Sequence, residues 1–282
     1  MTTLTPAREV RGSGPLVGLT WVFGPAALLC VLFMGVPIAA LVWRATSSGA
    51  LTENVTSSFA LDAMRLSAIT STFTLAIAIV VGTPLAYLLA RYDFPGKALV
   101  DVLVDLPVVL PPTVAGVALL VTLGRRGIIG EHLQAAGVDI AFTVTAVVLA
   151  QLFVAAPFYI RTVKAGFETI DPAYERLAWT LGASPWRTFR QITLPLAWPS
   201  ILAGAVLCWA RALSELGATL IFAGSYQGRT QTMPLAIIGA FESGKSIEVP
   251  IALAVILVIT AAALLAILRL IAGSVPRRAP RA

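Results

Sequence analysis

The sequence predicts an all-α, polytopic membrane protein with about six transmembrane helices. Of its 282 residues, 58% are hydrophobic and only 12% are charged, which is about half the charged share of a typical soluble domain. The mean hydropathy of +0.89 leaves too little polar surface to coat a soluble globule. The net charge of +6 is spread over the chain ends and certain loops, so we do not expect a nucleic acid as a partner.

Six apolar stretches are long enough to cross the hydrocarbon core of a bilayer, which takes about 20 residues of helix. They are Val17–Val42, Ser67–Ala90, Leu99–Leu123, Phe142–Ile160, Leu196–Ala223 and Val249–Ile271. The first is too long for the apolar part of a signal peptide, so we expect it to be retained. The chain is therefore expected to divide into a short cytoplasmic segment 1–16, a transmembrane domain 17–273 and a cytoplasmic tail 274–282.

The positions of lysine and arginine predict the orientation of these spans, because cytoplasmic loops are enriched in both. With the N-terminus inside, thirteen lie on the cytoplasmic side: Arg8, Arg11, Arg91, Lys97, Arg161, Lys164, Arg176, Arg187, Arg190, Arg269, Arg277, Arg278 and Arg281. Five lie on the other side: Arg44, Arg125, Arg126, Arg229 and Lys245. We therefore expect a multi-pass protein of the bacterial inner (cytoplasmic) membrane with both termini in the cytoplasm.

The cytoplasmic segment 161–195, called the coupling segment below, has the pattern of two short helices. Asp171, followed by proline, is suited to begin the first helix, and Gly182 is suited to end it. The second is expected to carry Trp186, Phe189 and Ile192 on one face and to end at Leu194 and Pro195. Such a pair of helices either lies on lipid or docks a cytoplasmic partner, and the residues alone leave both alternatives open.

The coupling segment resembles the EAA motif, the cytoplasmic loop that contacts the ATPase in permeases of ATP-binding cassette (ABC) importers. That motif reads Glu-Ala-Ala, three residues, Gly, nine residues, Ile, one residue and Leu-Pro. The residues that we assign to it are Glu175, Arg176, Leu177, Ala178, Gly182, Ile192, Leu194 and Pro195. Arg176 stands where the motif has glutamate, and Glu175 lies one residue early. The resemblance implies that this loop sits in a groove of an ATPase subunit.

Three further segments are similar to the molybdate, tungstate and sulfate branch of these importers. They are Gly82–Lys97, Asp105–Gly127 and Arg211–Ile237. The stretch GATLIFAG followed by GRTQTMPLAI favours a molybdate (or tungstate) permease over a sulfate or thiosulfate permease. The resemblance implies a type I importer fold, two copies of a cytoplasmic ATP-binding subunit and an extracytoplasmic oxyanion-binding protein. Since two ATPases need two docking loops and this chain has one, we expect a homodimer of the chain in the lipid bilayer.

Three prolines, Pro107, Pro111 and Pro112, interrupt the cytoplasmic half of the third predicted span. Each removes a backbone donor and frees a carbonyl group. Within a membrane such a break is tolerated where the backbone is buried in protein or lines a wet cavity. We expect either a translocation pathway here or a kinked helix that only packs.

Arg211 and Glu215 are the charged residues of the fifth predicted span, and Thr219 continues their helix face. Such a pair either lines the pathway or locks helix packing, because charges at membrane depth must be paired or wetted. Arg211 is the only basic residue in the middle of a span, so the pathway is expected to bind an anion weakly. The resemblance implies that selectivity resides in the separate binding protein.

Two other classes of protein were weighed. An intramembrane enzyme would need paired acids between spans, but Asp101 and Asp105 lie at one helix entrance beside Lys97 and are interpreted as interfacial. A secondary transporter would give the coupling segment no role. The chain carries no P-loop, so we do not expect it to be an enzyme itself. With one histidine and two cysteines in apolar runs, we expect neither a cofactor nor a metal site.

Overall fold

The computed structural model describes residues 16–54, 56–244 and 246–273, and these residues form helices and connecting turns without a strand. Residues 1–15 of the predicted N-terminal segment and the predicted tail 274–282 lie outside the described residues. The elements are α1 (Leu16–Ser47), α2 (Ala50–Asn54), α3 (Ser58–Arg91), α4 (Lys97–Val109), α5 (Pro112–Leu123), α6 (Gly130–Ala135), α7 (Val144–Glu168), α8 (Ala173–Thr180), α9 (Pro185–Thr188), a π-helical turn η1 (Phe189–Thr193), α10 (Leu194–Leu213), α11 (Gly217–Ala223), α12 (Met233–Glu242) and α13 (Glu248–Gly273).

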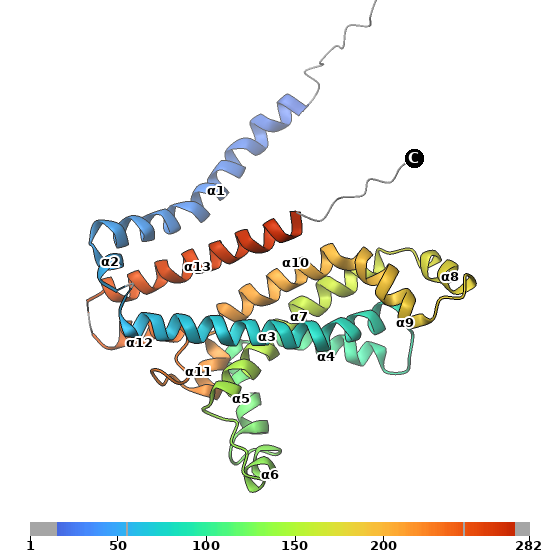
Figure 1. The fold of residues 1–282 in the computed structure, drawn as a ribbon. Helices are drawn as coiled ribbons and strands as arrows, with labels where there is room; N and C mark the ends of the chain where they lie inside the picture. Colours follow the sequence, from blue (N-terminus) through green and yellow to red (C-terminus); the bar gives the residue numbers. More distant parts are fainter. Residues whose placement is uncertain (1–15, 55, 245, 274–282) are drawn as a thin grey trace, which may run out of the picture.

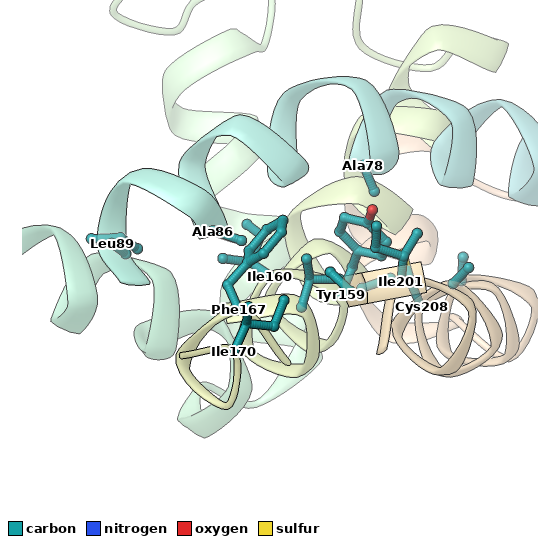
Figure 2. Close-up of a cluster of buried hydrophobic side chains, with 14 residues drawn as sticks. Ala78, Ala86, Leu89, Tyr159, Ile160, Phe167, Ile170, Ile201 and Cys208 are labelled. Carbon is teal, nitrogen blue, oxygen red and sulfur yellow. The ribbon is translucent and has the colours of Figure 1, made fainter. Parts of the chain in front are cut away.

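The core lies where α3, α7 and α10 pack together. Figure 2 shows its buried side chains, with Tyr159 of α7 among residues of the other two helices. Gly82 of α3 and Gly204 of α10 both face Tyr159, at distances that leave little room for a side chain. Small residues let helices approach closely in a membrane, where packing rather than hydrophobicity drives association. The Tyr159 hydroxyl is itself satisfied by Thr83, 2.6 Å away.

A buried polar network also joins α3 to α7. The Gln151 side chain donates to Thr70 (3.2 Å) and accepts from Thr74 (3.1 Å). Ser67, one turn earlier, accepts the backbone N–H of Met233 at the start of α12 (2.7 Å). Because lipid offers no partner for buried polar groups, such internal pairing is what allows this polar face of α3 to lie inside the bundle.

Four helices are long and apolar enough to cross a membrane: Phe23–Ser47, Ser58–Arg91, Val144–Glu168 and Pro185–Leu213. The pair α4 and α5 passes the same test together and would make a fifth span. Helix α13 occupies the sixth predicted stretch, and its described apolar part is Glu248–Ala263. The prediction of an all-α, polytopic membrane protein is confirmed.

Two of the predicted spans are not continuous helices. The third breaks between Val109 and Pro112, where α4 and α5 meet at 119°. Pro111 precedes Pro112 in extended conformation (ψ 135°), as steric clash with a following proline ring requires. Within the fifth predicted span, helix α10 ends at Leu213, and the next helix, α11, begins only at Gly217.

The arrangement places the coupling segment at one end of the bundle (Figure 1). Helices α8 and α9 lie at that end, and α2 and α12 lie at the opposite end. Helices α5 and α6 leave the side of the bundle, while α1 stands apart from the core. Residues 23–40 of α1 are all exposed in the single chain. An apolar surface this long implies lipid or protein neighbours.

Candidate functional site

The first helix of the coupling segment forms close to where the sequence predicts it. Helix α7 runs on to Glu168, so residues 161–168 belong to α7 and not to a loop. Asp171 accepts the backbone N–H of Ala173 (2.8 Å) at the start of α8. Gly182 has φ +82°, and the Ala183 N–H donates to the Ala178 carbonyl (3.0 Å). This left-handed turn is the glycine C-terminus that the sequence predicts.

The predicted end of the second helix at Leu194–Pro195 is wrong. Helix α9 passes through the π-helical turn η1 directly into α10, giving one helical run over Pro185–Leu213. Pro195 lies in the first turn of α10. It directly follows the π-helical turn, which inserts one extra residue into the helix. The coupling segment is therefore continuous with a transmembrane helix.

Helix α8 turns its large apolar side chains outward. Tyr174 is 55% exposed and Leu177 60%, Leu181 directly after the helix is 80% exposed, and Arg176 is also exposed. Ala178 is the one apolar residue of α8 that is buried. An exposed apolar face beside charged residues is what a docking surface presents.

Glu175, which the sequence places one residue early in the motif, is buried inside the protein. It lies 3.4 Å (Oε1) from Nε of Arg91, the last residue of α3. The hydroxyl of Thr193, in the π-helical turn, donates to the same carboxylate (2.7 Å). Arg91 also donates to the Ile170 carbonyl (2.9 Å). Sequence reasoning missed Arg91 and Thr193, since nothing in their local spacing points to Glu175.

The two breaks in the membrane helices lie side by side. A Cβ added to Gly217, the first residue of α11, would lie 2.9 Å from Cβ of Pro112. One added to Gly116 of α5 would lie 2.9 Å from the Ala218 carbonyl. The breaks at Pro111 and at Glu215 thus belong to one region, a relation that the sequence could not show. Pro107 is buried within α4.

Arg211 and Glu215 form an ion pair of 2.8 Å, but not on the shared helix face that the sequence predicts. Arg211 is in the last turn of α10, and Glu215 lies beyond its end. The Glu215 carboxylate, 1% exposed, also accepts the backbone N–H of Ala218 (2.9 Å) and so holds the start of α11. Thr219 lies in α11, with a buried hydroxyl that has no protein partner.

Asp101 and Asp105 pair across to α7 and not with Lys97. Lys164 lies 2.5 Å from Asp101, and Arg161 lies 2.8 Å from Asp105. Lys97 pairs instead with Asp93, on the connection before α4. The two cross-helix pairs line a polar pocket of about 260 Å³. They tie the first half of the broken span to the helix that leads into the coupling segment.

The sequence from residue 82 to residue 279 matches the family model for the inner membrane component of binding-protein-dependent transport systems. That match takes in more than half of the chain. The chain belongs to this family. The predicted resemblance to importer permeases is confirmed, and the chain is a multi-pass membrane permease, a transport component.

Relatives of this permease carry names that agree with the predicted branch. The molybdenum transport system permease protein ModB of Mycobacterium tuberculosis is 39% identical over 242 residues, which is 86% of this chain and 90% of that protein. The molybdate/tungstate permease protein WtpB of Thermococcus kodakarensis is 41% identical over 72% of this chain and 77% of its own length. ModB of Escherichia coli is 44% identical over 62% of this chain and 77% of its own length.

Solved structures of other importers share the fold of this permease. A bacterial ABC transporter that imports alginate matches with a TM-score of 0.73 at 16% identity, over 93% of this chain and 98% of that one. The MetNI methionine ABC transporter in an inward-facing conformation matches with a TM-score of 0.58 at 18% identity, over 82% of this chain and 99% of that one. The type I importer architecture that the resemblance implies is thus confirmed as a fold.

Proposed function

We propose that this permease forms the membrane pathway of an importer for molybdate or tungstate. The observation that carries the proposal is the identity of about 40% to permeases named for molybdenum, molybdate or tungstate transport, extending over up to 86% of the chain. The broken helices α4–α5 and α10–α11 support a pathway between them, because non-helical backbone at membrane depth belongs in protein interiors or wet cavities.

The pathway residues that we propose are those around the two breaks. Pro107, Pro111 and Pro112 shape one break, and Arg211, Glu215 and Thr219 surround the other. The side chain of Arg211 is 25% exposed although its partner is buried, so it is not fully enclosed by the single chain. Thr219, in α11, has a fully buried hydroxyl without a protein partner. A single cation suits a dianion that must pass through the pathway without binding tightly.

Two cytoplasmic ATP-binding subunits are proposed to dock on the coupling segment. The exposed apolar face of α8 supports this, as does the continuity of α9 with α10. Of the two alternatives that the residues left open, docking accounts better for a helix whose buried side is charged and whose outer side is apolar. An extracytoplasmic oxyanion-binding protein on the other side completes the proposed importer; an alginate importer of the same fold is described in complex with its periplasmic protein.

A homodimer with both termini in the cytoplasm is proposed for the assembly. Helices α1 and α13 both extend from the end of the bundle at which α2 and α12 lie, so the start of α1 and the end of α13 point away from that end (Figure 1), which supports the orientation predicted from lysine and arginine. The exposed apolar surface of α1 leaves room for a second copy as well as lipid. A purified complex holding one copy of this chain and no second permease would contradict the homodimer.

Uptake by vesicles that contain the full complex tests the substrate. Labelled molybdate and tungstate are expected to be taken up on addition of ATP and binding protein, with sulfate competing poorly at equal concentration. Vesicles without ATP are the control. Sulfate that outcompetes molybdate would assign the chain to a sulfate importer, and uptake without any ATPase subunit would contradict the importer class.

A further inference from the structure

The polar network at the end of α3 joins elements that are far apart in sequence. Arg91 ends α3, Glu175 lies in α8, and Thr193 ends the π-helical turn that leads into α10. The side chains of Arg91 and Glu175 are 8% and 5% exposed, and Thr193 is fully buried. Arg91 reaches in addition the Ile170 carbonyl, between α7 and α8. The Arg91–Glu175 ion pair therefore joins four segments: α3, the connection between α7 and α8, α8 itself and η1.

Helix α8 depends on this network for its attachment. Its only buried residues are Glu175 and Ala178, while its other apolar side chains face outward. The neighbouring segments are joined differently: rings of α3, α7 and η1 contact each other, with Tyr87 5.4 Å from Phe167 and 4.9 Å from Phe189. Where α3, α7 and η1 share an aromatic core, α8 is held to α3 mainly by a buried charge.

We propose that Arg91, Glu175 and Thr193 are positioning residues that transmit movement of the docked α8 to the membrane helices α3 and α10. A buried ion pair resists separation strongly, because a parted charge would be stranded away from water. Arg91 is the last residue of α3, and Thr193, which donates to Glu175, directly precedes α10. A displacement of α8 is thus transmitted to α3 and α10 together. The inference rests on the proposed docking of the ATPase at this segment.

The closing experiment compares Glu175→Gln with Asp93→Asn in the complete complex in vesicles. Both changes turn a carboxylate into its amide near the end of α3, but Asp93 has a fully exposed side chain and an exposed ion pair. Glu175→Gln keeps an acceptor for Thr193 and removes the charge that faces Arg91. Uptake of labelled molybdate and ATP hydrolysis are measured together, per assembled complex.

We expect Glu175→Gln to lower uptake per ATP hydrolysed by about tenfold, within the range of coupling between distant sites, while ATP hydrolysis continues. Thr193→Val is expected to shift the ratio in the same direction, and Thr193→Ser, which keeps the hydroxyl, to restore it. Asp93→Asn should leave the ratio unchanged. Uptake and hydrolysis that fall in proportion, or a normal ratio in Glu175→Gln, would overturn the proposal, because a purely structural role changes only the amount of complex.

A second measurement does not depend on the transported substrate. Spin labels at the exposed positions Thr180 and Phe94, in a chain with Cys30 and Cys208 replaced, report the distance between α8 and the end of α3. We expect this distance to stay fixed when ATP binds to the complex, and to broaden or change in Glu175→Gln. Equal behaviour of the two proteins would overturn the link. Absent oxyanion uptake in the wild-type complex would count against the proposed function, and the label distances would still decide the link.

Discussion

The ion pairs Arg91–Glu175 and Arg211–Glu215 both join an arginine to a glutamate, but they stabilise different parts of the structure. Arg211 and Glu215 are four residues apart and hold a local break, since Glu215 also accepts the backbone N–H of Ala218 in the first turn of α11. Arg91 and Glu175 are separated in the chain by the four helices α4 to α7, and they hold a whole segment to the bundle. The comparison shows that a buried ion pair can be predicted from spacing only when it serves local structure.

The largest effect is expected from Glu175→Ala. The change leaves Arg91 buried without a counter-charge and Thr193 without an acceptor, which should lower the free energy of unfolding by about 3–5 kcal/mol. The thermal midpoint of the purified complex and its abundance in membranes measure the loss. The matched control is Asp93→Ala, an exposed site where we expect a change within about 0.5 kcal/mol. Equal losses of stability at both sites would show that the buried ion pair contributes no more than an exposed one.

A smaller loss, about 2 kcal/mol, is expected from Glu215→Ala, because the Ala218 N–H and Arg211 both lose a charged partner. Arg211→Ala should cost a similar amount, since it leaves the buried Glu215 carboxylate with the Ala218 N–H but without its counter-charge. The double variant should cost less than the sum of the single changes. Stability and uptake are compared for the four proteins. Additive losses would mean that the pair does not act as a unit, and full uptake in the double variant would remove both residues from the pathway.

Gly182→Leu is expected to cost about 1 kcal/mol, because an L-residue is strained at positive φ. No atom lies within 4 Å of the added Cβ, so the strain is not a clash. Gly137, with φ +81° and equally open surroundings, offers a matched control at the far side of α6. Both variants should lose similar stability, but only Gly182→Leu should reduce co-purification of the ATPase subunit. Normal co-purification would contradict the docking role of the coupling segment.

The smallest effect is expected from Asp105→Asn. Its pair with Arg161 is about half exposed on both sides, and exposed ion pairs contribute about 0–1 kcal/mol. A thermal midpoint measured at low and high salt should differ less in the variant than in the wild type, since salt screens the intact pair. A loss as large as that of Glu175→Ala would show that exposure is a poor guide to these pairs.

The membrane character and the approximate positions of the long helices could be predicted from the sequence, because both depend on local runs of residues, but several helix ends could not: α3 begins at Ser58 and α7 runs on to Glu168. Apolar length alone located α3 and α7. Gly182 predicted the end of α8, since few residues other than glycine adopt positive φ at a helix end. Pro111 and Pro112 predicted a break in the helix of the third span, but they did not predict that α5 turns by 119° relative to α4. The size of that bend depends on how α5 packs against α11.

The sequence by itself determined that the chain crosses a membrane, that a helix ends at Gly182, and that Arg211 and Glu215 lie within reach of each other, because hydrophobic length, glycine geometry and short spacing act locally. Only the tertiary structure decided that Pro112 meets Gly217, that η1 makes α9 and α10 one helical run, and that Glu175 turns inward to Arg91. These contacts join residues distant in the chain. Their partners are selected by the packing of helices, and helix periodicity gives no information about which distant charge will be buried opposite.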